Sequence, residues 1–319
     1  MSNLNLGIIG AGYIAEEHLK AIKQIDGMSV EMIFSRTIEK SATLSRKYNI
    51  PLVCHDFNDF KKNIKKIDGI LILVSVENMF EITKLLIPFK TPLFIEKPPA
   101  LALDKINDLI SLADNYKTPN MVGFNRRFYS IYDKGLRIIH EHGGLLGLSI
   151  EGHERFWKIK DTITAEVRDK WLFANSSHTI DLIDFFGGDL AEIKILSDSL
   201  EENHGDQFVA LMKYKSGAIG TYTSHWYSPG GWSVSLYGDG VTVVYKPLES
   251  GKWIDKNFNE HEIKPSEYDL DLKEGFYQQM LTFKDLIQNG KLNWPAVSIK
   301  DSLPTMKNIE KFYLDYKNK

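Results

Sequence analysis

Short apolar runs alternate with helix-like segments over roughly the first 120 residues of the chain. The apolar runs are continuous enough for the strands of a parallel sheet that is covered on both faces. They lie at residues 6–10, 30–35, 69–74, 92–96 and 120–124. The segments between them place apolar residues at helical spacing, at residues 14–25, 38–48, 78–87 and 103–116. This alternation predicts an α/β domain built on a doubly wound sheet.

The pattern changes after about residue 125. A helix is predicted over residues 129–141 and another, amphipathic, over 298–317. Strand-like stretches separated only by turns lie at residues 145–159, 208–217, 218–227, 231–240 and 241–246. Several of them alternate apolar and polar residues, which is typical of antiparallel strands with one packed face and one open face.

The predicted fold class is therefore α/β, with two domains. An N-terminal domain with a doubly wound parallel sheet covers residues 1–122. A C-terminal α+β domain with a large, mostly antiparallel open sheet covers residues 123–319.

Composition fits this division. The 319 residues are 43% hydrophobic and 25% charged, as in soluble globular proteins, and exceed the usual size of a single core. The net charge of −3 gives no electrostatic footprint for nucleic acid or an anionic membrane. We see neither a signal peptide nor an apolar run that could span a membrane, and we expect a cytoplasmic location.

Candidate chemistry begins with the cysteine and histidine count. Cys54 is the only cysteine, which excludes an internal disulfide and argues against a cysteine-based metal site. The histidines show no ligand spacing, so no metal site is predicted.

The first strand runs into a glycine-rich turn, "GAGYIAEEH". Gly10 permits a tight turn, Gly12 lets the backbone approach a pyrophosphate, and Ala15 lets the following helix pack on the strand. We assign Tyr13 and Ile14, which lie within the turn, to the same site. The alternative is a purely structural turn, but the strand–turn–helix context favours a dinucleotide site.

The tip of the second strand, "IFSRT", bears on the choice of cofactor. An acidic residue there would bind the ribose 2′-hydroxyl of NAD, but the chain offers Ser35 and Arg36. A hydroxyl and a guanidinium suit a 2′-phosphate, so NADP is predicted and NAD is the alternative.

A third feature is "LFIEKPPALAL", where an apolar strand ends in Glu96 and Lys97, followed by two prolines. Strands of such a sheet end at the edge where ligands bind, and the prolines restrict the backbone behind them. A lysine beside a nicotinamide could hydrogen-bond a substrate hydroxyl and stabilise the alkoxide. The alternative is a structural Glu–Lys pair.

Four segments occur in a familiar order: "GIIGAGYIA", "EKPPA", "GFNRRF" and "HTIDLIDFFGG". Because of these segments, the chain resembles the glucose–fructose oxidoreductase/inositol dehydrogenase (Gfo/Idh/MocA) family, and the resemblance spans nearly the whole chain. The resemblance implies that residues 1–122 form an NAD(P)-binding Rossmann domain. It implies that residues 123–319 form an α+β domain for substrate binding and oligomerisation, with an open, mostly antiparallel sheet. It further implies oxidation or reduction of a sugar, cyclitol or sugar-nucleotide hydroxyl with NAD or NADP. It implies that Lys97 is the catalytic lysine and that Pro98 can follow a cis peptide.

The resemblance also implies a second catalytic element, D-x-G-x-H-x-x-D, which is "ANSSHTID" here. His178 and Asp181 match, whereas Ala174 replaces the first aspartate and Ser176 the glycine. His178 could still exchange the hydroxyl proton, with Asn175 assisting. Asp181 could equally be structural.

The chain also departs from the family's T-P-N-x-x-H motif, because residues 76–81 read "VENMFE". Cofactor contact through Ser75 and Asn78 is expected. In "GFNRRF", Asn125 is expected on the nicotinamide side, and the arginines could equally form surface salt bridges.

Basic and aromatic residues gather before His178: Arg155, Trp157, Lys158, Arg168 and Trp171. They suit a sugar that carries phosphate or a nucleotide, and Arg155, Trp157, Trp171 and Asn175 are the predicted substrate residues. Strand packing beside a solvated loop is the alternative. The segment "SHWYSPGGW" at 224–232 could line a site or form a subunit interface. We favour the interface, so a homodimer or homotetramer through the C-terminal sheet is expected.

The predicted function is an NAD(P)-dependent oxidoreductase acting on a sugar-like small molecule, with no nucleic-acid or membrane partner. Two alternatives remain open: a non-catalytic dinucleotide-binding sensor or regulator of the same fold, which the lost aspartate favours, and a reductase of another small molecule.

Overall fold

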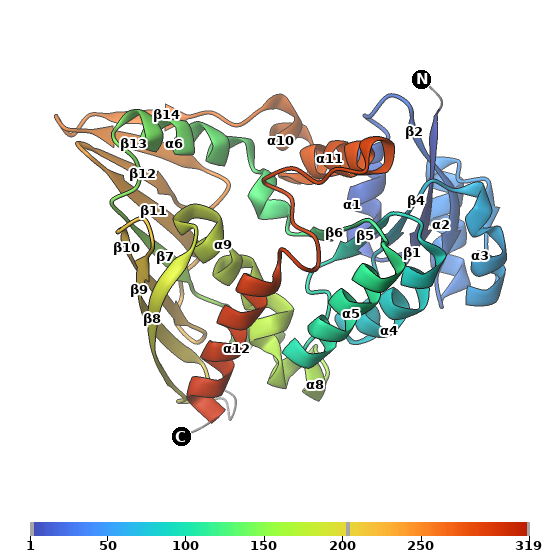
Figure 1. The fold of residues 1–319 in the computed structure, drawn as a ribbon, viewed down its shortest axis with the longest axis horizontal. Coiled ribbons are helices and arrows are strands. Elements are labelled where there is room, and N and C mark those ends of the chain that lie inside the picture. Colours follow the sequence, from blue (N-terminus) through green and yellow to red (C-terminus); the bar gives the residue numbers. More distant parts are fainter. Residues whose placement is uncertain (1–2, 202–204, 318–319) are drawn as a thin grey trace. The chain divides into compact units, whose positions relative to one another are not determined.

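The computed structural model describes residues 3–201 and 205–317. The chain forms two compact units, whose elements are labelled in Figure 1. Unit 1 comprises Met1–Phe128 and Tyr268–Leu303, and unit 2 comprises Tyr129–Glu267 and Pro304–Lys319. The predicted domain boundary at 122/123 stays a prediction. In the structure, the segment Tyr268–Leu303 belongs to unit 1, although it follows unit 2 in the sequence.

Unit 1 contains a six-stranded sheet in the order β3-β2-β1-β4-β5-β6, and every neighbouring pair is parallel. Its strands are β1 (Leu4–Ile9), β2 (Met28–Phe34), β3 (Leu52–Val53), β4 (Gly69–Ile72), β5 (Leu93–Glu96) and β6 (Asn120–Gly123). The strand order reverses between β1 and β4, so the predicted doubly wound parallel sheet is confirmed. The sequence missed β3 because a two-residue strand carries no periodic signal.

The helices of unit 1 are α1 (Tyr13–Ile22), α2 (Ile38–Tyr48), α3 (Phe57–Asn63), α4 (Val76–Leu86), α5 (Leu103–Tyr116) and α11 (Phe276–Asn289), with short η1 (Ile64–Lys66), η2 (Ile87–Phe89) and η3 (Asn125–Phe128). Four of them, namely α1, α2, α4 and α5, begin within two residues of the predicted starts. The short α10 (Glu267–Asp271) lies where the chain passes from unit 2 to unit 1. Helices α3 and α11 were not predicted.

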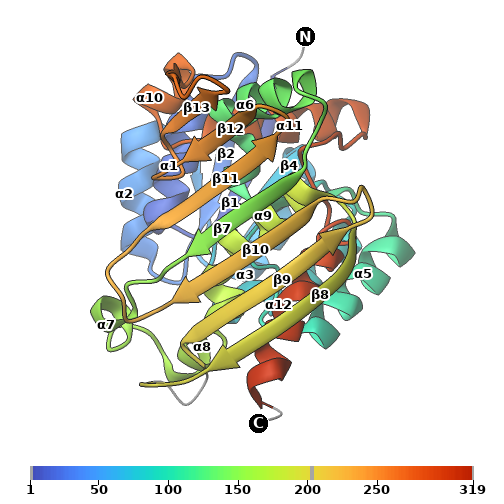
Figure 2. The same ribbon diagram turned by 90° about the vertical axis from the view of Figure 1, so that its left-hand side faces the viewer.

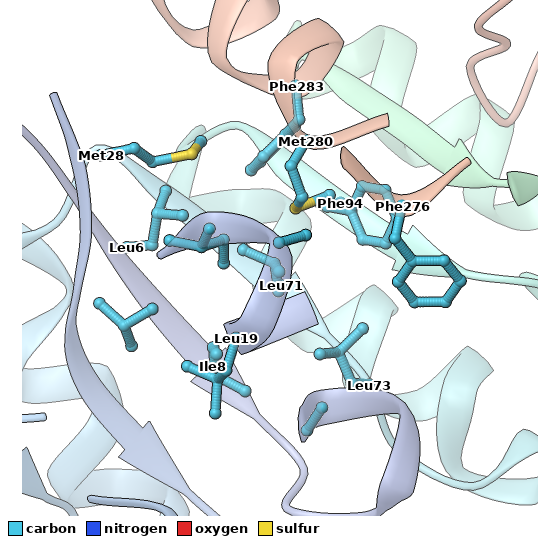
Figure 3. Packing of buried hydrophobic residues seen from close by; sticks show 14 of the residues in the cluster. Leu6, Ile8, Leu19, Met28, Leu71, Leu73, Phe94, Phe276, Met280 and Phe283 are labelled. Atoms are coloured by element: carbon cyan, nitrogen blue, oxygen red, sulfur yellow. The ribbon is translucent and has the colours of Figure 1, made fainter. Parts of the chain in front are cut away.

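Helix α11 completes the core of unit 1. Figure 3 shows Phe276, Met280 and Phe283 of α11 near Phe94 of β5, and they share one buried cluster with Leu19 of α1. The exposed fraction of each of these side chains is 3% or less. Burial of large apolar side chains such as these contributes roughly 1.5–3 kcal/mol each. Helix α1 is therefore held between the sheet and a segment more than 200 residues away in the sequence.

Unit 2 contains an eight-stranded sheet in the order β14-β13-β12-β11-β7-β10-β9-β8, in which only β7 and β10 pair in parallel. Its strands are β7 (Gly147–Gly152), β8 (Leu190–Asp198), β9 (Gln207–Tyr214), β10 (Ile219–His225), β11 (Trp232–Gly238), β12 (Val241–Tyr245), β13 (Gly251–Asp255) and β14 (Glu260–Ile263). The predicted mostly antiparallel sheet is confirmed. The prediction of one strand over 145–159 is wrong beyond Gly152, because the chain leaves the sheet there and forms a short helix.

One face of this sheet carries the helices of unit 2. They are α6 (Ser130–Glu141), α7 (Phe156–Ile159), α8 (Ala165–Asp169), the π-helical turn η4 (Leu172–Ser176), α9 (Ser177–Gly187) and α12 (Leu303–Lys317). Figure 2 looks onto the opposite face, with α6, α9 and α12 behind the strands. That open face exposes Leu196, Leu211 and Ile219 by 58–68%.

Trp226, expected at a subunit interface, lies instead inside unit 2. Its exposed fraction is 1%, and its ring packs against Phe156 and Phe208. The aromatic residue that was read as an interface signal is a core residue, so it gives no support to oligomerisation.

The turn after β1 depends on Gly10. Its φ is +115°, and a Cβ added there would lie 2.2 Å from the carbonyl oxygen of Leu73. The Gly10 N–H also donates to the carbonyl of Phe34 at 2.8 Å. A side chain at Gly10 would have to push apart the ends of β1 and β4, which are neighbours in the sheet.

We predict that Gly10→Ala lowers the free energy of unfolding by at least about 2 kcal/mol, from backbone strain together with the clash. Gly27→Ala is the matched control, because Gly27 also has a positive φ (+72°) but its added Cβ would meet only the Lys284 ammonium, at 3.6 Å. Urea denaturation of both variants measures the difference. Equal losses in the two variants would contradict a steric role for Gly10.

Candidate dinucleotide and substrate sites

Unit 1 contains a cavity of about 270 Å³ at the carboxyl ends of β1, β2 and β4. Six of the predicted cofactor residues line it: Gly10, Gly12, Ser35, Arg36, Ser75 and Asn78. The carboxyl edge of a doubly wound sheet, at the point where the strand order reverses, is where such folds bind ligands. Arg36 is exposed, and the Asn78 amide donates to the Ser75 hydroxyl at 2.8 Å.

Gly12 is the residue that opens this cavity to a phosphate group. It lies at the N-terminus of α1 with φ −89° and ψ −175°, and an added Cβ would have nothing within 4 Å. Backbone N–H groups at a helix N-terminus favour anions. Because the local backbone needs no glycine, the open space fits the close approach of a pyrophosphate.

A neighbouring cavity of about 410 Å³ involves Gly12, the predicted cofactor residue Tyr13, Glu16 and Lys40. Lys40 also lines the first cavity and was missed by the sequence analysis. It lies four residues after Arg36, in the first turn of α2, and a second cation this near in the sequence could have indicated a further partner for the same phosphate. Of the other predicted residues, Ala15 is fully buried, as expected of a helix–strand packing residue, and Ile14 lines neither cavity.

Glu96 and Lys97 end β5 and are both half-buried. The Lys97–Pro98 peptide is cis, as the resemblance implied. The Glu96 carboxylate lies 3.6 Å from Nε2 of His18, a fully buried histidine between the rings of Phe94 and Phe276. His18 was not predicted as a site residue, because a histidine on an apolar helix face is usually a core residue.

Asn125 is occupied by local contacts. Its exposed fraction is 6%, its amide donates to the Glu274 carbonyl at 3.2 Å, and its side-chain oxygen accepts from Arg126 at 3.2 Å. It lines neither cavity of unit 1 described above, so its role beside a nicotinamide stays a prediction.

Unit 2 has its own cavity, of about 440 Å³. Three of the four predicted substrate residues line it, namely Arg155, Trp171 and Asn175, together with Trp232 and other residues of the β11 and β12 ends. Trp157 is half-buried in α7 and is not among the lining residues. The basic residues Lys158 and Arg168 also lie outside the lining.

Glu154 lies at the floor of this cavity and was missed by the sequence analysis. Its exposed fraction is 4%, and its two carboxylate oxygens accept from the Asn175 amide at 2.8 Å and the Ser176 hydroxyl at 3.0 Å. The neighbouring Arg155, which the sequence singled out, is exposed. A lone glutamate beside an arginine gives no sequence signal of burial.

His178 begins α9 and is half-buried, with its ring centroid 5.8 Å from that of Trp232, a cavity residue. Asp181, one turn along, is buried and accepts from the Thr305 hydroxyl at 2.9 Å. The structural alternative raised for Asp181 therefore fits its contacts. His178 remains the proton-exchanging candidate of unit 2.

Two features favour the neutral form of His153, which lies at the cavity wall. Burial lowers the pKa of His153, while the Glu151 carboxylate opposes this shift. Its Nδ1 accepts the backbone N–H of His225 at 3.1 Å, a bond that protonation of Nδ1 would break. The imidazole therefore presents a neutral ring, with the proton on Nε2.

Other chemistries find no support among residues 3–201 and 205–317. No group of three or more His, Cys, Asp or Glu residues there could hold a metal ion. Cys54 is fully buried, and burial raises the pKa of its thiol to about 11, so it is no nucleophile at neutral pH. No helix in the described chain is long and apolar enough to cross a membrane.

Comparison with known proteins places these sites in a family. Residues 4–124 match the family described as "Oxidoreductase family, NAD-binding Rossmann fold", and residues 150–244 match the "GFO/IDH/MocA C-terminal domain". A 4-carboxy-2-hydroxymuconate-6-semialdehyde dehydrogenase from Sphingobium sp. (strain NBRC 103272 / SYK-6) is 21% identical over 85% of this chain and 91% of its own length.

Two solved structures share the fold over nearly the whole chain. An oxidoreductase from Agrobacterium radiobacter, in complex with NAD+, L-tartaric acid and magnesium, is 17% identical, with a TM-score of 0.84 over 99% of this chain and 97% of that one. Levoglucosan dehydrogenase, in complex with NADH and L-sorbose, is 15% identical, with a TM-score of 0.81 over 100% and 98%. The prediction of an NAD(P)-dependent oxidoreductase is confirmed. The chain belongs to the Gfo/Idh/MocA oxidoreductase family, whose N-terminal domain is an NAD-binding Rossmann fold.

Proposed function

We propose that the protein transfers a hydride to or from a hydroxyl carbon of a sugar or cyclitol, with NADP as the preferred cofactor. The observation that carries the proposal is the cavity at the Gly10–Gly12 turn, because six predicted cofactor residues line it. Gly12 offers open backbone to the pyrophosphate, and Arg36 and Lys40 offer cations to a 2′-phosphate. A nicotinamide bound there supplies the hydride acceptor or donor.

The remaining chemistry falls to the two catalytic residues predicted from the sequence. Lys97 follows β5, and its ammonium would hydrogen-bond the reacting hydroxyl and stabilise the alkoxide. His178 would exchange the hydroxyl proton, since imidazole titrates near neutral pH. A sugar-like substrate is supported by the levoglucosan dehydrogenase that shares the fold and by the aromatic walls of the cavity in unit 2.

Two alternatives have specific observations behind them. Ala174, where the family motif has an aspartate, is buried and brings no carboxylate, which favours a dinucleotide-binding sensor. The curated relative is named for a carboxylated semialdehyde, which favours a reductase or dehydrogenase of another small molecule. Absorbance of the reduced nicotinamide, followed across free sugars, cyclitols, sugar nucleotides and semialdehydes, separates these possibilities. Tight cofactor binding without turnover of any class would favour the sensor.

Two further questions concern the assembly of the protein and its location in the cell. The exposed Leu196, Leu211 and Ile219 on the open face of the sheet support a homodimer or homotetramer through that face. Light scattering of the purified protein tests this, and a monomer would exclude it. A cytoplasmic location stays a prediction of the sequence.

Gly12→Val should weaken NADPH binding at least about tenfold, roughly 1.4 kcal/mol, because the branched side chain would occupy the space proposed for the pyrophosphate. The fold should tolerate the change, since nothing lies within 4 Å of the new Cβ. Fluorescence titration measures the affinity, and thermal melting checks the fold. Unchanged affinity in a folded variant would remove the dinucleotide from this turn.

Arg36→Ala should lower the ratio of NADP to NAD affinity towards or below one, because charge-assisted bonds of this kind contribute about 1.5–3 kcal/mol. Lys40→Ala should lower the ratio in the same direction. Arg46→Ala is the matched control, because Arg46 is an exposed arginine of α2 that does not line the cavity. A wild-type protein that prefers NAD would refute the 2′-phosphate assignment.

Lys97→Met should reduce the rate of hydride transfer by about 10²–10⁴, because it deletes a positioned acid–base group while keeping the length of the side chain. Cofactor affinity should change little, since Lys97 does not line the cavity around Gly10–Gly12. Single-turnover absorbance and cofactor titration measure the two quantities. Lys105→Met, at an exposed position of α5, is the control, and near-normal transfer in Lys97→Met would leave Lys97 a structural role only.

A further inference from the structure

The buried Glu154 carboxylate lies where the chain leaves β7 and meets the turn before α9. Both of its oxygens accept hydrogen bonds from that turn, one from the Asn175 amide and one from the Ser176 hydroxyl. A buried carboxylate requires such donors, because desolvation without them costs several kcal/mol. The bonds therefore fix the η4 turn, two and three residues before His178, to the end of β7.

This contact decides which way the Asn175 amide is turned. A carboxylate only accepts, so Asn175 must direct its NH₂ group to Glu154 and keep its carbonyl oxygen for other partners. Asn175 is half-buried and lines the cavity of about 440 Å³. Glu154 thereby engages one N–H of Asn175 and leaves the carbonyl oxygen, beside the second N–H, for whatever occupies the cavity.

The charges around the cavity limit its occupant. Two carboxylates, Glu154 and Glu249, line it with one guanidinium, Arg155, and His153 is neutral. An anion such as a phosphate would be repelled by the carboxylates, whereas hydroxyl groups can donate to them and to Asn175. The rings of Trp171 and Trp232 offer apolar faces to a sugar ring. The phosphate-binding interpretation of the basic residues is therefore weakened for this cavity.

We propose that Glu154 is a positioning residue that orients the Asn175 amide, and that the cavity takes the uncharged, hydroxyl-bearing ring of a sugar or cyclitol in preference to a phosphorylated one. The substrate class named in this proposal rests on the proposed function. The orientation of Asn175 does not rest on it, because the contact with Glu154 exists without a ligand.

The orientation is tested by NMR of protein with ¹⁵N-labelled asparagine. The side-chain NH₂ signals of Asn175 are assigned by their loss in Asn175→Ala. In Glu154→Gln, which keeps the volume but removes the charge, these signals should shift, and their hydrogen exchange should become at least about tenfold faster. Glu249→Gln removes a carboxylate from the same cavity and should leave them unchanged. Unchanged Asn175 signals in Glu154→Gln would overturn the positioning role.

The preference is tested by kinetics of the NADP-loaded protein with matched pairs: D-glucose and D-glucose 6-phosphate, D-fructose and D-fructose 6-phosphate, myo-inositol and myo-inositol 1-phosphate. The uncharged member should have the higher kcat/KM, and Glu154→Gln should raise its KM about tenfold with a smaller change in kcat.

In the Asn175→Ala background, Glu154→Gln should add little, because both changes remove one interaction. A preference for phosphorylated members, or additive losses, would overturn the proposal. Absence of turnover with every probe would instead count against the proposed function, while the NMR result still decides the role of Glu154.

Discussion

The close approach of the Gly10 backbone to the Leu73 carbonyl is the constraint on which unit 1 depends. Gly10 follows β1, bonds to the end of β2 through the Phe34 carbonyl, and leaves no room for a Cβ beside the residue after β4. The ends of β1, β2 and β4 therefore meet at the backbone of Gly10. The direction in which the chain leaves this point sets the axis of α1, and with it the position of the N–H groups that face the cavity. The cofactor site is thus a consequence of how the sheet ends.

Unit 2 builds its cavity by a different means. There the fixed point is a side chain, the Glu154 carboxylate, and the partners are the side chains of Asn175 and Ser176. A backbone turn keeps its shape whichever residues flank it, provided that the glycine remains. A side-chain network changes its hydrogen-bonding pattern with a single substitution, because one altered partner reverses which groups donate and which accept. This difference suits a family that keeps one cofactor class and varies the substrate.

The contrast also explains which features could be predicted from the sequence. The parallel sheet and the glycine turn were predictable, because continuous apolar strands and a G-x-G pattern are local signals. Helix α11 was not, since its Phe276 and Phe283 gain their role only by packing on α1 and β5. Trp226 was misread for the same reason, because a tryptophan just after a strand looks the same in the sequence whether it faces the core or solvent. Glu154 was missed because its burial depends on donors 21 and 22 residues away.

The loss of an aspartate at position 174 has a more limited meaning than the motif alone suggests. Ala174 is buried beside Phe173, so an acidic side chain there would itself need donors. The structure provides donors one and two residues later, at Asn175 and Ser176, and both are already bound to Glu154. A carboxylate therefore still contacts the segment that leads into His178, but it comes from the end of β7 rather than from the motif. By the motif alone this carboxylate would count as missing, whereas the packing of unit 2 supplies one from the segment that follows β7.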